Sequence, residues 1–376
     1  MYSAPPVSSP LPSDAPAKAP RTRLRSAGAK LVASLLIAAG FIWVFQRGGL
    51  PIVPDRDALS LVSPWSVVAY FVFVALATAL RPYRWIYLLR PIAPGISRAR
   101  VFAIGLVGFT AIFFAPLRMG EIVRPWLLAE DGEVTFFQAT GTVAAERIID
   151  GLVLTLFLIA SLVLSDPLPQ LPDHLGQLAL PVGAVPEAAY LSAAMFAGAL
   201  ISMAVFYRWR ALARRLVHVT VGLVSVKLAD WMSLRVERLS DGFKFLPSRN
   251  AGAFVRDSVL YWVFTLSATW ALLRGAGVSA TFAEAGVILG VMGIGTLIPS
   301  GPGFFGTYQL AVYLGLAMFF PESTVFGAGA VFAFVSYCVH LTLTAASGLI
   351  GVVILARTKP HALEAPAVSA GTRSRP

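Results

Sequence analysis

Long apolar runs alternate with short polar segments along most of the chain. A helix needs about 20 mostly apolar residues to cross the hydrocarbon core of a bilayer. Some runs reach that length, whereas those at 101–117, 283–298 and 304–320 are short for a full crossing. The pattern predicts membrane-embedded helices over these runs: 31–45, 64–80, 101–117, 136–165, 188–207, 257–273, 283–298, 304–320 and 325–356.

Basic side chains concentrate in only some of the connecting segments. Residues 81–100 contain several arginines and no acidic residue, and 208–256 is rich in Lys and Arg. By contrast, 166–188 contains acidic residues and no Lys or Arg. Loops rich in Lys and Arg stay on the cytoplasmic side of a membrane. We therefore expect both termini, 81–100 and 208–256 to be cytoplasmic, and 166–188 and 321–324 to be external.

This orientation constrains the short runs. The run 136–165 alone takes the chain from the inside to the outside, so 101–130 must enter the membrane and return to the same side. The same argument makes 283–320 enter and return from the outside. Each segment is either a pair of short spans or a re-entrant hairpin, and two broken elements around a central site are typical of transporters. The predicted fold is an all-α polytopic integral membrane protein, with about six full spans and two broken or re-entrant helical hairpins entering from opposite faces.

The ends of the chain and one long connection differ from the apolar runs. Residues 1–25 and 357–376 are predicted to be disordered cytoplasmic tails, which leaves 26–356 as a single transmembrane domain. Within 208–256, apolar residues recur three and four positions apart and predict two amphipathic helices. These helices lie on the membrane surface or pack on the inner ends of the spans. The two apolar stripes are Leu212, Leu216, Val219, Leu223 and Val226, and Met232, Val236, Leu239, Phe243 and Leu246.

The composition excludes several classes of protein. Hydrophobic residues make up 57% of the 376 residues and charged residues only 13%, whereas soluble domains are roughly 25% charged. A soluble enzyme and a disordered protein are therefore excluded. The net charge of +11 fits a cytoplasmic face near anionic headgroups, so we expect membrane lipids as partners and no nucleic acid. A single Cys338 and scattered histidines predict no metal site, and no motif for a cofactor or for ATP is present.

The first candidate site is the segment Pro116–Pro125, PLRMGEIVRP. Pro116 should break the preceding helix, and Gly120 permits a tight bend. Arg118, Glu121 and Arg124 are three positions apart, so they share one side of a helix. Guanidinium groups bind phosphate through paired hydrogen bonds. The segment is therefore either an arginine-rich cradle for a phosphate or a cytoplasmic loop with surface ion pairs.

The second candidate site is Glu146-Arg147-Ile148-Ile149-Asp150, inside an apolar run. Charges at membrane depth are costly, and they face partners or a water-filled cavity. This group is either a structural ion-pair network that fixes helix packing or a site that handles a proton or a lipid headgroup. Arg118 or Arg124 is the expected partner of Glu146 or Asp150.

Two further segments carry candidate residues. Proline and glycine residues interrupt the helical pattern between the short runs 283–298 and 304–320. The backbone groups that this break leaves without helical partners lie either in the wall of a cavity or in an external turn. In a cavity wall, the start of the next helix would favour an anion. The residues singled out there are Pro299, Gly301, Pro302, Gly303, Gly306, Tyr308 and Gln309. At the end of the second run, Arg81 and Arg84 flank aromatic residues, as in interfacial anchors or headgroup contacts.

In this order, PLRMGEIVRP, ERIID and PSGPGFFG resemble the lysylphosphatidylglycerol synthase transmembrane-region family, also called flippase-like proteins, over about residues 25–356. The resemblance implies a multi-pass protein of the bacterial inner membrane that moves lipid between leaflets. The sequence departs from the family pattern at two places. Family members often have Glu shortly after the proline–glycine break, where this chain has Gln309, and Asn just before the first motif, where it has Ile112 and Phe113. Because about twenty residues follow the last run, we expect no synthase domain. The family's charged positions fall on Arg118, Glu121, Arg124, Glu146, Arg147 and Asp150, and its break falls on Pro302, Gly303 and Gly306.

The residues and the resemblance together predict a lipid translocase, or flippase, that is not an enzyme. Its cargo would be an anionic or phosphate-bearing lipid, either a phospholipid or an isoprenoid-linked lipid. The candidate residues of 116–125, 146–150 and 299–309 would line the translocation path, and Arg81 and Arg84 would contact headgroups at the interface. The alternative is a non-transporting membrane partner of a lipid- or glycan-synthesis enzyme. An intramembrane transferase is disfavoured because clustered acidic residues and a metal motif are missing.

Overall fold

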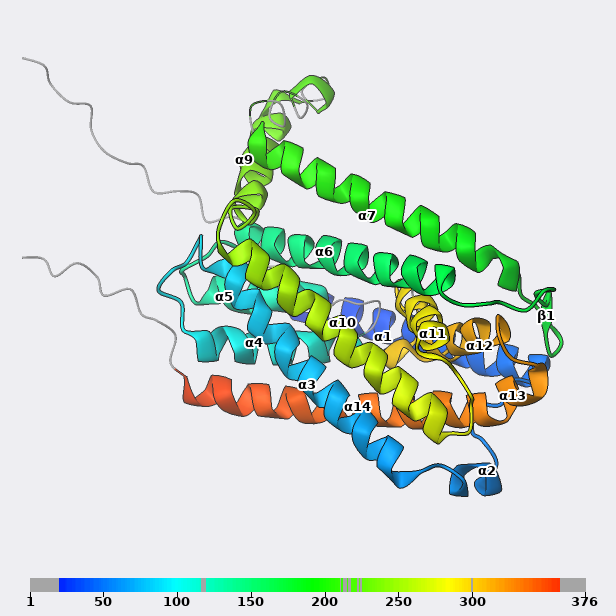
Figure 1. The fold of residues 1–376 in the computed structure, drawn as a ribbon. Helices are drawn as coiled ribbons and strands as arrows, with labels where there is room; N and C mark the ends of the chain where they lie inside the picture. The colour runs from blue at the N-terminus through cyan, green and yellow to red at the C-terminus, as the bar shows by residue number, and fades with distance from the viewer. Residues whose placement is uncertain are drawn as a thin grey trace, which may run out of the picture.

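The computed structural model describes residues 20–115, 120–209, 211, 215, 218–221, 223, 225–298 and 300–358. Over these residues helices joined by turns and loops make up the chain, with two short strands, β1 (His174–Leu175) and β2 (Leu178–Ala179), which pair antiparallel. Figure 1 shows the long helices running along one another in a bundle. The expected all-helical architecture is confirmed for the described part of the chain.

Long helices form the frame of the bundle. A helix rises about 1.5 Å per residue, so about 20 residues cover the hydrocarbon core. Three helical segments are long and apolar enough to cross a membrane: Pro64–Leu89, Val182–Arg208 and Glu322–Arg357. The chain is therefore a helical membrane protein. The long helices are α1 (Pro20–Gly48), α3 (Pro64–Leu89), α6 (Phe136–Val163), α7 (Val185–Arg208), α10 (Asn250–Gly275) and α14 (Ala328–Arg357).

Two pairs of short helices lie within this frame. Helices α4 (Arg98–Phe114) and α5 (Gly120–Glu130) pack together, as do α11 (Phe282–Gly295) and α12 (Thr307–Ala317). The first pair lies toward one end of the bundle and the second toward the other end (Figure 1). They meet inside it, where the ring of Phe113 lies 5.6 Å from the ring of Phe304. Two short-helix pairs therefore stand where the sequence predicted broken elements.

The segments that the sequence separated by charge lie at opposite ends of the bundle. Figure 1 places the α3–α4 connection, α9 (Val226–Asp241) and the end of α14 at one end, and α2 (Arg56–Ser60), β1 and α13 (Glu322–Phe326) at the other. The first end carries the Arg- and Lys-rich stretches 90–100 and 225–249, whereas 166–187 at the second end has acidic residues and no Lys or Arg. The buried apolar side chains form two clusters, one around α11 and α12 and one around Trp85 and Ile149.

The second predicted amphipathic helix is shorter than its apolar stripe. Helix α9 (Val226–Asp241) ends before Phe243, and the chain continues through turns to α10. The reason is a close contact with α6, because a Cβ on Gly242 would lie 2.6 Å from the amide nitrogen of Thr142. Phe243 is buried against the second apolar cluster in this turn. The prediction that the stripe stays helical to Leu246 is therefore wrong, and Leu212 and Leu216 of the first stripe lie outside the described residues.

We expect a Gly120→Ala substitution to destabilise the fold strongly. A Cβ on Gly120 would lie 2.0 Å from the amide nitrogen of Ile112, so α5 could not pack as closely against α4. Overpacking of this kind costs about 1–3 kcal/mol and sometimes more. Thermal unfolding in detergent measures the loss. Gly252→Ala is the control, because nothing lies within 4 Å of its Cβ position, and equal melting temperatures of the two variants would contradict the packing argument.

Candidate functional site

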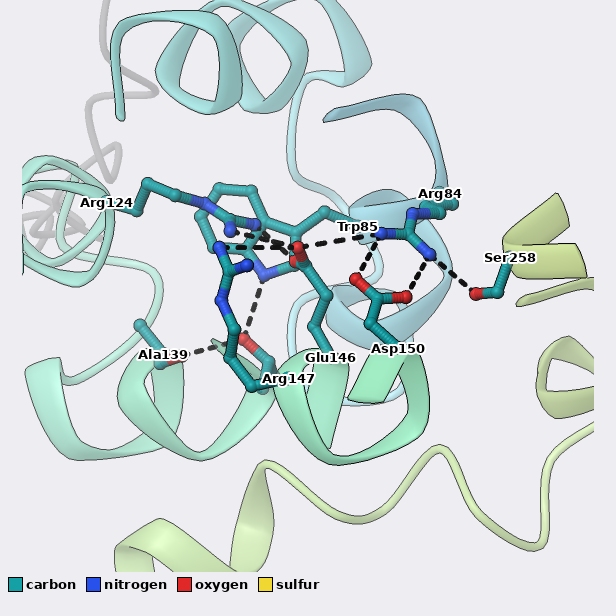
Figure 2. Close-up of polar contacts among 9 residues, drawn as sticks. Arg84, Trp85, Arg124, Ala139, Glu146, Arg147, Asp150 and Ser258 are labelled. Carbon is teal, nitrogen blue, oxygen red and sulfur yellow. Dashed lines mark hydrogen bonds and ion pairs between the residues drawn. The ribbon is translucent and has the colours of Figure 1, made fainter. Parts of the chain in front are cut away.

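Arg84 of α3 and Asp150 of α6 form a buried ion pair. The two Nη atoms of Arg84 donate to the two carboxylate oxygens of Asp150, and Nη1 also donates to Oγ of Ser258 on α10 at 2.6 Å (Figure 2). Arg84 has no exposed surface. The prediction of an interfacial Arg84 is therefore wrong, because a carboxylate and a hydroxyl inside the bundle hold its guanidinium there.

Glu146 is the acceptor at the centre of a larger charge network. Arg124 of α5 donates to its two oxygens, at 2.7 Å and 3.3 Å. Arg84 and Arg147 also approach Glu146, at 3.9 Å and 4.0 Å (Figure 2). The expected pairing of a hairpin arginine with a carboxylate of the 136–165 run is confirmed for Arg124, while Arg118 lies outside the described residues.

Aromatic rings fix the guanidinium of Arg124 in this position. Its carbon Cζ lies 4.2 Å from the ring centre of Trp85 and 4.4 Å from that of Phe109. The indole of Trp85 is itself oriented, because Nε1 donates to Oγ1 of Thr142 at 3.0 Å. A Cβ on Gly108 would lie 1.9 Å from Cγ of Arg124, so the glycine leaves room for the arginine stem. These contacts hold α4, α5 and α6 together around the network.

A cavity of about 280 Å³ lies beside the network. Its walls come from helices α3, α4, α6, α7, α10, α11 and α14 and from the start of α12. Most of the lining is apolar or aromatic, and Phe113 and Phe304 at the tips of the two short-helix pairs belong to it. Among the described residues, the charged side chains in its walls are Arg81, Arg147 and Asp150.

The two arginines in the cavity wall have unused hydrogen-bond donors. Nε of Arg81 and both Nε and Nη2 of Arg147 are buried and donate to no acceptor in the described part of the chain. Both guanidinium groups lie near Phe109, with Cζ at 4.1 Å and 5.6 Å from the ring centre. The network and the cavity together hold four guanidinium groups and two carboxylates. Since buried unpaired donors are costly, the arrangement favours an anion. Arg81 thus lies in the cavity wall.

The break between α11 and α12 is packed inside the protein. Gly303 and Gly306 have φ angles of 71° and 94°, in the left-handed region that glycine adopts without strain. A Cβ on Gly303 would lie 2.6 Å from the hydroxyl of Tyr337, and one on Gly301 would lie 2.8 Å from Cβ of Ala38. A simple external turn does not fit these contacts. Of the predicted residues in this segment, Tyr308 lines the cavity, Pro302 begins the short helix η3 (Pro302–Phe304), and Pro299 lies outside the described residues.

Gln309 caps its own helix. Its Oε1 accepts a hydrogen bond from the amide of Gly306 at 2.8 Å, and the side chain is buried. Neither Gln309 nor Glu121, which lies in the first turn of α5, is part of the cavity wall. The structure thus brings Arg84, Arg124, Glu146, Arg147 and Asp150 together and leaves these two side chains outside that group.

Replacing Gln309 by Met should lower stability by about 1 kcal/mol, as the loss of a helix cap does. Methionine keeps the length of the side chain and removes the acceptor for the Gly306 amide. Thermal unfolding measures this loss. Gln309→Glu keeps an acceptor oxygen and places negative charge at a helix start, where it is favoured, so we expect a smaller loss. A melting temperature unchanged in Gln309→Met would contradict the capping role.

Several site residues gave no sequence signal. Ser258, Phe109 and Trp262 belong to no motif along the sequence, and only the tertiary fold brings them to the network and the cavity. His340 also lines the cavity, and its Nδ1 lies 3.0 Å from the hydroxyl of Tyr70. Among the described residues, no group of three or more His, Cys, Asp or Glu side chains could hold a metal ion.

These features define a class of protein: a helical membrane protein with a buried charge network and a positively charged cavity between two broken helix pairs. The family model for the lysylphosphatidylglycerol synthase TM region matches residues 31–344, and the chain belongs to this family. The resemblance found in the sequence motifs is therefore confirmed. Comparisons with curated proteins and with solved structures gave no match.

Proposed function

We propose that this protein is a lipid translocase that moves an anionic or phosphate-bearing lipid, phospholipid or isoprenoid-linked, between the leaflets of the bacterial inner membrane. One observation carries the proposal. The cavity wall presents Arg81 and Arg147 with buried donors that have no acceptor in the described residues. An anionic headgroup supplies both the acceptor oxygens and the negative charge that this site lacks.

The same structure supports a topology for this proposal. The six long helices would cross the membrane, and α4–α5 and α11–α12 would be re-entrant hairpins that enter from opposite faces and meet at Phe113 and Phe304. The end of the bundle with the Arg- and Lys-rich segments would be cytoplasmic, together with both termini. In this topology the cavity would lie between the two hairpin tips, as in transporters that bind cargo near the bilayer midplane.

The cavity supports a path for a headgroup through the bilayer. A charged group in hydrocarbon is costly, and water, protein partners or counter-charges remove that cost. Arg81 and Arg147 would take the headgroup, while the aromatic and aliphatic lining faces the carbon chain. No covalent step is needed, so we propose that the chain acts as a carrier and not as an enzyme.

Lipid movement in vesicles tests this proposal. The full chain would be reconstituted in phosphatidylcholine vesicles with trace phosphatidylglycerol carrying a fluorophore that dithionite reduces only in the outer leaflet. We expect dithionite to reach nearly all of the label in vesicles with the protein and about half in vesicles without it. Equal fractions in both preparations would contradict translocation. Labelled phosphatidylcholine is the matched cargo control, and we expect it to move more slowly.

A second candidate function is a non-transporting partner of a lipid- or glycan-synthesis enzyme. Helix α9 favours it, because its side chains Leu228, Trp231 and Leu234 are 43%, 49% and 57% exposed at one end of the bundle. A surface of this kind suits a protein partner or the membrane surface. Purification with a stoichiometric enzyme, together with no lipid movement by the chain alone, would favour this function over translocation.

A further inference from the structure

We propose that the cavity selects a lipid whose headgroup ends in a phosphate monoester over a lipid with a phosphate diester. This inference rests on the proposed function and narrows its cargo. A monoester has three terminal oxygens and carries up to two negative charges, whereas a diester has two terminal oxygens and one charge. Two independent counts in the structure, of charges and of free donors, match the monoester.

The first count concerns charge. Arg84 is paired with Asp150 through two hydrogen bonds, and Arg124 is paired with Glu146 in the same way. These two pairs use both carboxylates of the site. Arg81 has no ion pair among the described residues, and Arg147 reaches only the already shared Glu146, at 4.0 Å. Counted over the described residues, the site therefore has two positive charges in excess, which one dianion balances.

The second count concerns hydrogen-bond donors. Three side chains of the cavity wall keep buried N–H groups without an acceptor in the described residues: Arg81 of α3, Arg147 of α6 and Trp262 of α10. Trp262 is a donor only, so it adds no charge. The hydroxyls of Thr155 and Thr265 in the same wall donate to backbone carbonyls of their own helices. These three side chains carry four buried donor nitrogens without an acceptor in the described residues: Nε of Arg81, Nε and Nη2 of Arg147, and Nε1 of Trp262. Four donors are enough to reach each of the three terminal oxygens of a monoester and exceed the two terminal oxygens of a diester.

Shared aromatic neighbours connect these three donors. Phe109 lies beside the guanidinium groups of both Arg81 and Arg147. Tyr261 lies 5.6 Å from Cζ of Arg81, and its ring centre is 4.9 Å from that of Trp262. The free space of about 280 Å³ far exceeds the roughly 10–15 Å³ that one water molecule needs. The size of the cavity admits either type of phosphate, so charge and donor number decide between them.

Binding measurements with two lipids test the inference. Native mass spectrometry of the full chain would be titrated at pH 8 with dioleoylphosphatidic acid, a monoester, and with dioleoylphosphatidylglycerol, a diester. We expect the monoester to bind at least about tenfold more tightly, which corresponds to about 1.4 kcal/mol. Inorganic phosphate is the soluble competitor, and we expect it to displace little of the lipid. Equal binding of the two lipids, or displacement by inorganic phosphate as effective as by the lipid, would overturn the inference.

Trp262→Phe isolates the neutral donor. The change keeps an aromatic ring and removes the N–H, so the affinity for the monoester should fall about fivefold or more while binding of the diester changes little. Trp270→Phe is the matched control, because its Nε1 donates to the carbonyl of Ala280 at 3.2 Å and Trp270 does not line the cavity. An equal loss for both lipids in Trp262→Phe, or no loss for either, would overturn the role of Trp262.

The same measurements separate this inference from the proposed function. Equal binding of both lipids in a protein that still moves them across vesicles would overturn only the preference for a monoester. A preference for the monoester in a protein that moves no lipid would overturn translocation and keep the binding site.

Discussion

Replacing Arg81 and Arg147 together by glutamine should abolish lipid movement and leave the fold at least as stable as before. The two guanidinium groups carry the excess charge of the cavity wall and have unused buried donors. Removing a buried charge that lacks a full counter-charge relieves its desolvation cost. The same change removes the groups that would bind an anionic headgroup.

The dithionite assay with labelled phosphatidylglycerol, combined with thermal unfolding in detergent, measures both effects. We expect the double variant to move lipid no faster than protein-free vesicles do, at a melting temperature equal to or above that of the unchanged chain. Arg98→Gln is the matched control, because this arginine is exposed in the first turn of α4 and should change neither quantity. Lipid movement at the normal rate in the double variant would remove Arg81 and Arg147 from the path.

Arg84→Met should have the opposite effect on stability. We expect it to destabilise the fold by about 3–5 kcal/mol, as the loss of one partner of a buried ion pair does. Arg84 has no exposed surface, and it holds both carboxylate oxygens of Asp150 and the hydroxyl of Ser258. Without it, the carboxylate of Asp150 stays buried without its main counter-charge.

The double variant Arg84→Met/Asp150→Leu tests this explanation. Replacing both partners of a buried pair by apolar side chains is often neutral or stabilising. We therefore expect the double variant to recover most of the stability that Arg84→Met loses, and the coupling energy of the double-mutant cycle should be large. Strictly additive effects of the two substitutions on the free energy of unfolding would contradict the pairing.

The part of the site that could be predicted from sequence has local signals. Charges at 146–150 inside an apolar run must have a partner or a cavity, and the spacing in 118–124 put arginines on one side of a helix. This reasoning found the pairing of Arg124 with Glu146. The short apolar runs likewise predicted two segments that enter the membrane and return, as pairs of short spans or re-entrant hairpins, because their length and the distribution of basic loops require an even number of crossings there.

The rest depends on tertiary contacts that no local pattern encodes. Arg84 follows an apolar run and precedes Trp85, which is typical of an interfacial anchor, yet Asp150 and Ser258 on two other helices hold it inside the bundle. Helix α9 ends early because Gly242 packs against the backbone of α6. Gln309 caps its own helix. The comparison with the Glu that family members often have at this position did not indicate a capping role.

The central claim is that Arg81 and Arg147 hold an anionic lipid headgroup in the cavity. Mass spectrometry of the lipids that co-purify with the full chain and with Arg81→Gln/Arg147→Gln tests it most directly. The account predicts that the unchanged chain retains a phosphate-bearing anionic lipid and that the double variant retains much less of it. The same lipid retained in equal amount by both proteins would contradict the claim.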